Sequence, residues 1–124
     1  MKEVIKTEKA APALGAYVQG ISTGNLVFTS GQLGLDPETG ELEEGIVSQA
    51  KRSMDNLKAI LETAGVSMEN VIKSTIYLAD INDFAQVNEV YQSYFTGEYP
   101  ARSCVQVGAL PKGALVEIEM IAGK

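Results

Sequence analysis

The 124-residue sequence contains no histidine and no tryptophan, and it has a single cysteine, Cys104. Without histidine the chain cannot build a Ser-His-Asp or Cys-His catalytic group, and it lacks the commonest metal ligand in proteins. One cysteine cannot form an internal disulfide or a zinc cluster. We therefore expect no metal and no cofactor, and because a disulfide framework is missing we expect a reducing, cytoplasmic compartment.

Positive charge is also scarce, and long apolar runs are missing. Ten lysines and arginines, scattered along the chain, face sixteen aspartates and glutamates, so the net charge is −6. Nucleic-acid surfaces need clustered basic residues, so we expect no nucleic-acid partner. No apolar run approaches the roughly 20 residues of a membrane span, and the N-terminus is not typical of a signal peptide, so we expect no membrane partner.

What the chain does contain is the composition of a globular protein, with 45% hydrophobic residues, and we expect residues 1–124 to form one domain. Alternating and β-branched runs predict strands at 2–6, 17–21, 26–33, 71–79, 101–107 and 114–121. Apolar residues at helical spacing predict a helix over 45–64 and a second one that follows Asp80 and Asn82 and ends before Gly97. The predicted order is β-β-α-β-α-β-β, preceded by the short strand candidate at 2–6.

This order predicts an α+β fold with one mixed sheet of about six strands. Two strand–helix–strand crossovers of the usual right-handed kind place both helices on one face of the sheet. The other face is then bare, and an apolar sheet face without a cover is typical of an interface. We therefore expect a homo-oligomer.

The segment Pro100 to Ile121 carries charged residues inside apolar strands. Arg102 and Cys104 share one strand face, and Glu117 and Glu119 share a face of the next strand. If the loop at 108–113 closes a hairpin without a bulge, all four side chains lie on one side, with Arg102 opposite Glu119; a single bulge moves the glutamates to the other side. The simplest explanation for this pattern is a cross-strand Arg–Glu pair on a solvated face.

A glycine interrupts the predicted strand at 26–33. Gly31 indicates a bulge or a close approach by another group, or else a simple bend in the sheet.

At these residues the chain resembles the RidA (YjgF) family over nearly its whole length. The resemblance rests on GAYVQ at 15–19, TSGQ at 29–32, the helix residues Phe84, Asn88 and Tyr91, and PARSC at 100–104 followed by VEIE at 116–119. The last pair of motifs, with its spacing, is the most specific. Two residues depart from the family pattern: Ala16 stands where proline is usual and Val18 where serine is common.

The resemblance implies a reactive-intermediate deaminase with a chorismate-mutase-like (YjgF) fold. Such a protein is a homotrimer whose sheets form a central barrel with the helices outside, and a cleft lies at each subunit interface. Its reaction is the hydrolysis of 2-imino acids, such as 2-iminobutanoate and 2-iminopropanoate, or of their enamine tautomers, to 2-oxo acids and ammonia.

Carried over by position, the resemblance makes Arg102 the ligand of the substrate carboxylate and Glu117 the group that positions or deprotonates water. The other implied site residues line the cleft or hydrogen-bond the substrate: Tyr17, Ser30, Gly31, Asn88 and the backbone of Cys104. The choice of Glu117 over Glu119 rests on the resemblance, because the strand pattern treats them alike. The remaining glutamate is a candidate ion-pair partner for Arg102.

This chemistry suits a chain without histidine. An arginine can hold a carboxylate through two parallel charge-assisted hydrogen bonds, and a protonated C=N carbon needs only an oriented water and a base. No histidine or lysine is placed by the sequence to activate Cys104, so we expect a wall residue rather than a nucleophile.

Two other functions share these residues. A non-catalytic trimer that binds small 2-oxo acids, or acts as a chaperone-like regulator, would use Arg102 but would gain nothing from a nearby Glu117. RNA cleavage or translation inhibition, also associated with the family, is disfavoured by the acidic charge and the missing histidine.

Overall fold

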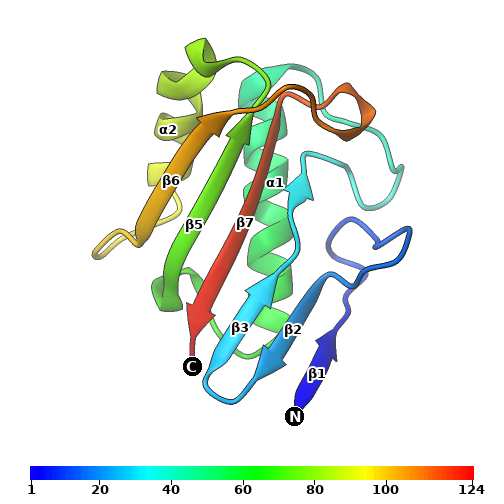
Figure 1. Cartoon of the computed structure of the whole chain (residues 1–124), viewed down its shortest axis with the longest axis vertical. Coiled ribbons are helices and arrows are strands. Elements are labelled where there is room, and N and C mark those ends of the chain that lie inside the picture. Colours follow the sequence, from blue (N-terminus) through cyan, green and yellow to red (C-terminus); the bar gives the residue numbers. More distant parts are fainter.

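The computed structural model describes residues Met1–Lys124 as one sheet covered on one side by two helices (Figure 1). In chain order the elements are β1 (Lys2–Ile5), β2 (Gly20–Thr23), β3 (Leu26–Thr29), β4 (Gln32–Leu33), α1 (Gly45–Thr63), η1 (Met68–Asn70), β5 (Val71–Leu78), η2 (Ile81–Asp83), α2 (Phe84–Gln92), β6 (Ala101–Gln106), η3 (Pro111–Gly113) and β7 (Val116–Gly123). The predicted α+β architecture is confirmed. None of the helices is both long and apolar enough to cross a membrane.

The sheet has the strand order β1-β2-β3-β7-β5-β6, and the short strand β4 also pairs with β7. The expected hairpin between the last two strands is wrong, because β5 lies between them: β6 pairs with β5 in parallel, and β7 pairs with β5 antiparallel. Burial explains this order. Every second side chain of β7 is buried, as suits a central strand, whereas β6 has no buried residue, as suits an edge.

Both helices pack on the same face of the sheet, behind it in the view of Figure 1. The inward face of α1 contributes Met54, Leu57 and Ile60, none of which is measurably exposed, and alternate residues of β5 and β7 meet them. Close packing of this kind removes the apolar surface of both layers from water. The apolar residues whose spacing predicted this helix are therefore the ones that pack against the sheet.

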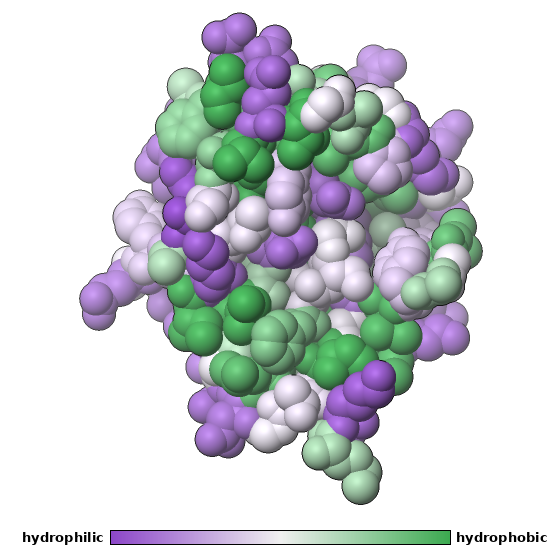
Figure 2. Space-filling model, in the orientation of Figure 1, coloured by the Kyte–Doolittle hydropathy of each residue, from purple (hydrophilic) through white to green (hydrophobic).

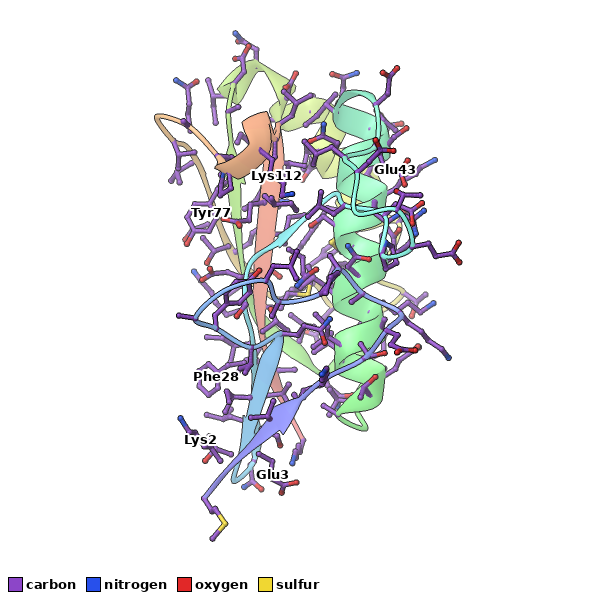
Figure 3. The ribbon with its side chains drawn as sticks, turned by 90° about the vertical axis from the view of Figure 1, so that its right-hand side faces the viewer. Lys2, Glu3, Phe28, Glu43, Tyr77 and Lys112 are labelled. Atoms are coloured by element: carbon purple, nitrogen blue, oxygen red, sulfur yellow. The ribbon has the colours of Figure 1, made fainter.

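The opposite face of the sheet is open. Val4, Ile21, Phe28 and Ile121 pair in register across β1, β2, β3 and β7, and we call this row the apolar band. Figure 2 views this face, and hydrophobic side chains gather on its lower half. Figure 3 shows the sheet from its edge, with Phe28 and Tyr77 on the side away from α1. The expected bare apolar face is present.

The predicted strand at 26–33 is broken in two. Pairing stops after Thr29 and resumes at Gln32, so Ser30 and Gly31 lie outside the ladder. The break turns the chain so that β4 runs beside the start of β7, where Leu33 pairs with Glu117. The interruption thus brings Gly31 close to Glu117.

Candidate functional site

Arg102 lies on β6 and points toward the helix layer. Its guanidinium donates a hydrogen bond of 2.8 Å to Asn88 Oδ1 on α2. The same group stands over two rings of α2, with its carbon 5.0 Å from the centre of Tyr91 and 5.4 Å from that of Phe84. An amide acceptor and two π faces fix the orientation of the arginine without neutralising its charge.

Arg102 has no acidic partner in the chain. The only ion pairs within 4.0 Å involve Arg52, so the predicted simple explanation, a cross-strand Arg–Glu pair, is wrong. The guanidinium lines a hollow of about 340 Å³ with Asn88, Tyr91, Gln92, Tyr99 and Pro100. A fixed, unpaired cation at the wall of a hollow is suited to an anionic ligand.

Cys104 lies two residues further along β6 on the same face as Arg102, and it is half-buried. Burial raises the pKa of its thiol, and the Arg102 charge offsets this only in part. The thiol is therefore protonated at neutral pH. This suits a residue that only lines the cleft, whereas a nucleophilic cysteine would need to be a thiolate.

Glu117 lies on β7 and points to the open face. It packs against Gly31 so closely that a Cβ built on the glycine would lie 2.8 Å from the Glu117 carboxyl carbon. No other residue type fits there without displacing the carboxyl group. Of the alternatives for Gly31, the close approach is confirmed, and it coincides with the break in the strand.

Glu117 and Gly31 line a cavity of about 590 Å³ on the open side of the sheet. Burial raises the pKa of the Glu117 carboxyl, and the neighbouring negative charge of Glu119 raises it further. A carboxyl group whose pKa is moved toward neutrality can both accept and return a proton. Of the two glutamates, Glu117 is the one that contacts Gly31.

Two further predicted residues, Tyr17 and Ser30, line the same cavity. Tyr17 is half exposed on the loop before β2. Ser30 is held in place from both ends: its backbone N–H donates to Gln19 O at 2.8 Å, and its hydroxyl donates to Val18 O. The cavity therefore joins Tyr17, Ser30, Gly31 and Glu117 around one space.

The predicted site residues fall into two groups. Arg102, Cys104 and Asn88 lie toward the helix layer. Across β5, Arg102 is in register with Met120 and Cys104 with Ile118, so Glu117 and Glu119, which alternate with these residues on β7, lie on the open face. Of the two arrangements left open, the one that a bulge-free hairpin would give, with Arg102 and the glutamates on one side, does not occur within a single chain. The two hollows have no lining residue in common.

Two residues of the cavity region were missed from the sequence. Lys112, which also lines the cavity, has φ +61° and is the only non-glycine residue with positive φ. Tyr77 lies beside Glu119 on the open face, and burial together with that carboxylate raises the pKa of its phenol. Nothing in the local sequence marks Lys112; Tyr77 could have been found once β5 was placed next to β7.

No three histidine, cysteine, aspartate or glutamate side chains are grouped so that they could hold a metal ion.

Comparison with known proteins gives concordant matches. A family model described as endoribonuclease L-PSP matches residues 7–124. The chain is 47% identical over 125 residues to the 2-iminobutanoate/2-iminopropanoate deaminase of Escherichia coli K12, covering 98% of both chains.

Solved structures agree with this. The crystal structure of RidA from the Antarctic bacterium Psychrobacter sp. superimposes with a TM-score of 0.96 at 50% identity, covering 98% of this chain and 99% of that one. Escherichia coli TdcF with bound serine superimposes with a TM-score of 0.96 at 47% identity, covering 98% of both chains.

Proposed function

The chain belongs to the endoribonuclease L-PSP (YjgF/RidA) family, and we propose that it hydrolyses 2-imino acids and their enamine tautomers to 2-oxo acids and ammonia. The observation that carries the proposal is the combination of a fixed, unpaired Arg102 with a Glu117 carboxyl of raised pKa. The name of the Escherichia coli deaminase and the serine bound to TdcF support an amino-acid-like substrate.

The two groups of site residues lie on different faces, so we propose that one catalytic cleft is formed by two copies of the chain. One copy supplies Arg102, Cys104 and Asn88, and the neighbouring copy supplies Tyr17, Ser30, Gly31 and Glu117. The apolar band gives the copies a surface to share. We propose that they assemble as the homotrimer that the family resemblance implies.

In this cleft Arg102 binds the substrate carboxylate through paired N–H donors, and Asn88 keeps the guanidinium oriented. The backbone N–H of Gly31 and the backbone of Cys104 hold the rest of the substrate. Because binding fixes the C=N carbon beside Glu117, attack by water becomes a step within one complex.

Glu117 accepts a proton from water as the water oxygen bonds to the C=N carbon and the π electrons move to nitrogen. It then returns this proton to the amine. The C–N bond breaks, the former water oxygen becomes the carbonyl of the 2-oxo acid, and its remaining proton passes to the departing ammonia, so a protonated imine yields the 2-oxo acid and ammonium. Glu117 thus acts first as base and then as acid.

The test is a coupled assay in which a threonine dehydratase generates 2-iminobutanoate and the appearance of 2-oxobutanoate is followed. We expect the wild type to accelerate this step. Arg102→Ala should lower kcat/KM by roughly 10- to 100-fold, the worth of a charged hydrogen-bonded contact, and Glu117→Gln should lower kcat by about 10² to 10⁴. Lys58→Ala, which removes an exposed cation of α1 that lines neither hollow, is the control.

A folded, assembled wild type without acceleration would overturn the deaminase proposal. Measured binding of 2-oxobutanoate by that same protein would then favour the non-catalytic binder. RNA cleavage receives no support from the site, because the chain has no histidine and carries a net charge of −6.

A further inference from the structure

The buried face of α1 carries a polar stripe that the apolar pattern does not explain. Gln49, Ser53 and Asn56 stand at i, i+4 and i+7, so they form one row on the helix. Their exposed fractions are 5%, 0% and 0%. Polar side chains buried this completely need hydrogen-bond partners, and those partners show what the stripe does.

Ser53 and Asn56 bind the chain just after Gly31. The Ser53 hydroxyl donates to Gln32 O at 2.7 Å, and the Asn56 amide donates to Leu35 O at 3.0 Å and to Leu33 O at 3.4 Å. We call residues 30–35 the ledge. Because β4 has only two residues in the ladder, these side-chain donors replace strand partners that the ledge lacks.

Gln49 connects the helix to the strand of Glu117. Its carbonyl oxygen accepts a hydrogen bond of 2.8 Å from the backbone N–H of Leu115, two residues before Glu117. Its amide nitrogen donates to Glu43 O at 3.1 Å. One row of α1 therefore holds both the ledge and the start of β7, the two segments whose contact places Gly31 against Glu117.

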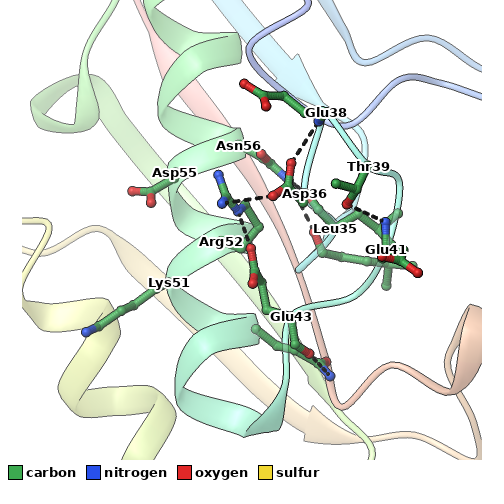
Figure 4. Close-up of polar contacts among 12 residues, drawn as sticks. Leu35, Asp36, Glu38, Thr39, Glu41, Glu43, Lys51, Arg52, Asp55 and Asn56 are labelled. Carbon is green, nitrogen blue, oxygen red and sulfur yellow. Dashed lines mark hydrogen bonds and ion pairs between the residues drawn. The ribbon is translucent and has the colours of Figure 1, made fainter.

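The approach of α1 to the ledge is close. A Cβ on Gly34 would lie 2.4 Å from the backbone oxygen of Gln49, so only glycine allows the contact. Figure 4 shows the outer side of this junction, where Arg52 donates to Glu43 at 2.8 Å and pairs with Asp36 at 3.5 Å, and Asn56 reaches the ledge behind them.

The stripe is a costly way to fill a core. One acceptor of the stripe, Asn56 Oδ1, and one of the ledge, Gln32 Oε1, are buried without a hydrogen-bond partner, and each such group costs about 1–3 kcal/mol. Apolar residues of the same size would avoid this cost. The polar residues are therefore better explained by the position they impose than by the stability they add.

We propose that Gln49, Ser53 and Asn56 are positioning residues that fix the ledge and the start of β7, and so hold Gly31 and Glu117 in their reactive arrangement. None of the three lines the Glu117 cavity, so their effect on catalysis passes through the backbone. The expected changes in kcat rest on the proposed deaminase function. The expected changes in the position of the ledge do not.

The first test compares Ser53→Ala with Thr63→Ala. Both remove one hydroxyl from α1, but Thr63 donates to Ala59 O of its own helix and touches no part of the ledge. Because a small misplacement of a catalytic group can cost up to about 10²-fold, we expect Ser53→Ala to lower kcat per folded protein about 10-fold with KM changed less than about twofold. We expect Ser53→Cys, which keeps a weak donor, to recover part of kcat and Thr63→Ala to match the wild type.

The pH profile separates positioning from simple destabilisation. The groups around Glu117 are Glu119 on β7, Tyr77 on β5, and Lys112 and Tyr17 from the loops that line the cavity. When the ledge loosens, water reaches Glu117 and its pKa falls, so the acid limb of kcat moves to lower pH. The proposal would be overturned if kcat fell only in proportion to the amount of folded protein and the acid side of its pH profile did not shift.

Hydrogen exchange provides a readout that needs no activity. We expect Ser53→Ala to speed exchange about 10-fold or more in a peptide covering residues 30–35, whereas Thr63→Ala leaves this peptide unchanged. Unchanged exchange in Ser53→Ala would refute the positioning role even in an active enzyme. If the wild type lacks deaminase activity but the exchange pattern appears, the proposed function fails and the structural inference stands.

Discussion

Glu117 brings a negative charge into a half-buried cavity that contains a second carboxylate, Glu119. Burial is the larger cause of its raised pKa, and the Glu119 charge is the smaller one. A base must be ionised to accept a proton from water, so the proposed activity should fall as the pH drops through this raised pKa.

Glu119→Gln should move the acid limb of kcat to lower pH. Removing the like charge lowers the pKa of Glu117, but the limb should stay above the ordinary glutamate range because burial remains. A pH series of kcat for wild type and Glu119→Gln measures this. A limb that does not move, or that moves to higher pH, would show that Glu117 is not the titrating base.

For individual residues, the sequence was enough to select site candidates but not to predict which residues they contact. Arg102, Glu117 and Gly31 could be selected because a charge or a glycine inside a strand needs a reason. The contact between Gly31 and Glu117 could not, since the two residues are far apart in the chain and meet only after β4 pairs with β7. The polar stripe of α1 was visible as a periodicity but was hidden by the apolar stripe beside it.

The break between β3 and β4 lies at the cavity, and Gly31 in that break permits the close approach of the Glu117 carboxyl. Gly31→Ala should leave the sheet folded but push the Glu117 carboxyl aside, because the new Cβ would lie 2.8 Å from the carboxyl carbon. A displaced base should lower kcat about 10-fold or more. Gly108→Ala, with no atom within 4 Å of the new Cβ, is the matched control for steady-state kinetics. Equal activity of both variants would contradict this account.

Among the elements, those defined by local pattern were predicted well. The first helix was expected over 45–64 and spans Gly45–Thr63, and the strand expected over 71–79 spans Val71–Leu78. The failure was the final pair of strands. A six-residue loop favours a hairpin, but the parallel pairing of β6 with β5 is a non-local choice that depends on which strand gains most from burial, and no local signal reports it.

For the whole molecule, we expect the open face to decide the state of association. Phe28 lies in the apolar band and is 39% exposed. In a monomer, this apolar side chain would remain in contact with water, which is unfavourable in free energy. We expect Phe28→Asp to convert the assembly to monomers and to abolish activity. Val47→Asp, at a similarly exposed residue on the helix side (38%), should keep the assembly. Light scattering after size exclusion measures both, and a Phe28→Asp protein that remains assembled and active would refute the interface.

The position of β5 between β6 and β7 has a genetic consequence. If each cleft takes Arg102 from one subunit and Glu117 from the next, two inactive proteins can repair each other. In a ring of three, every mixed assembly of Arg102→Ala and Glu117→Gln subunits contains one intact junction. Random reassortment of an equal mixture should therefore restore about a quarter of the wild-type rate. Complementation between two null alleles of one gene would be the visible sign of this strand order, and a mixture as inactive as its parents would place both residues in one subunit's cleft.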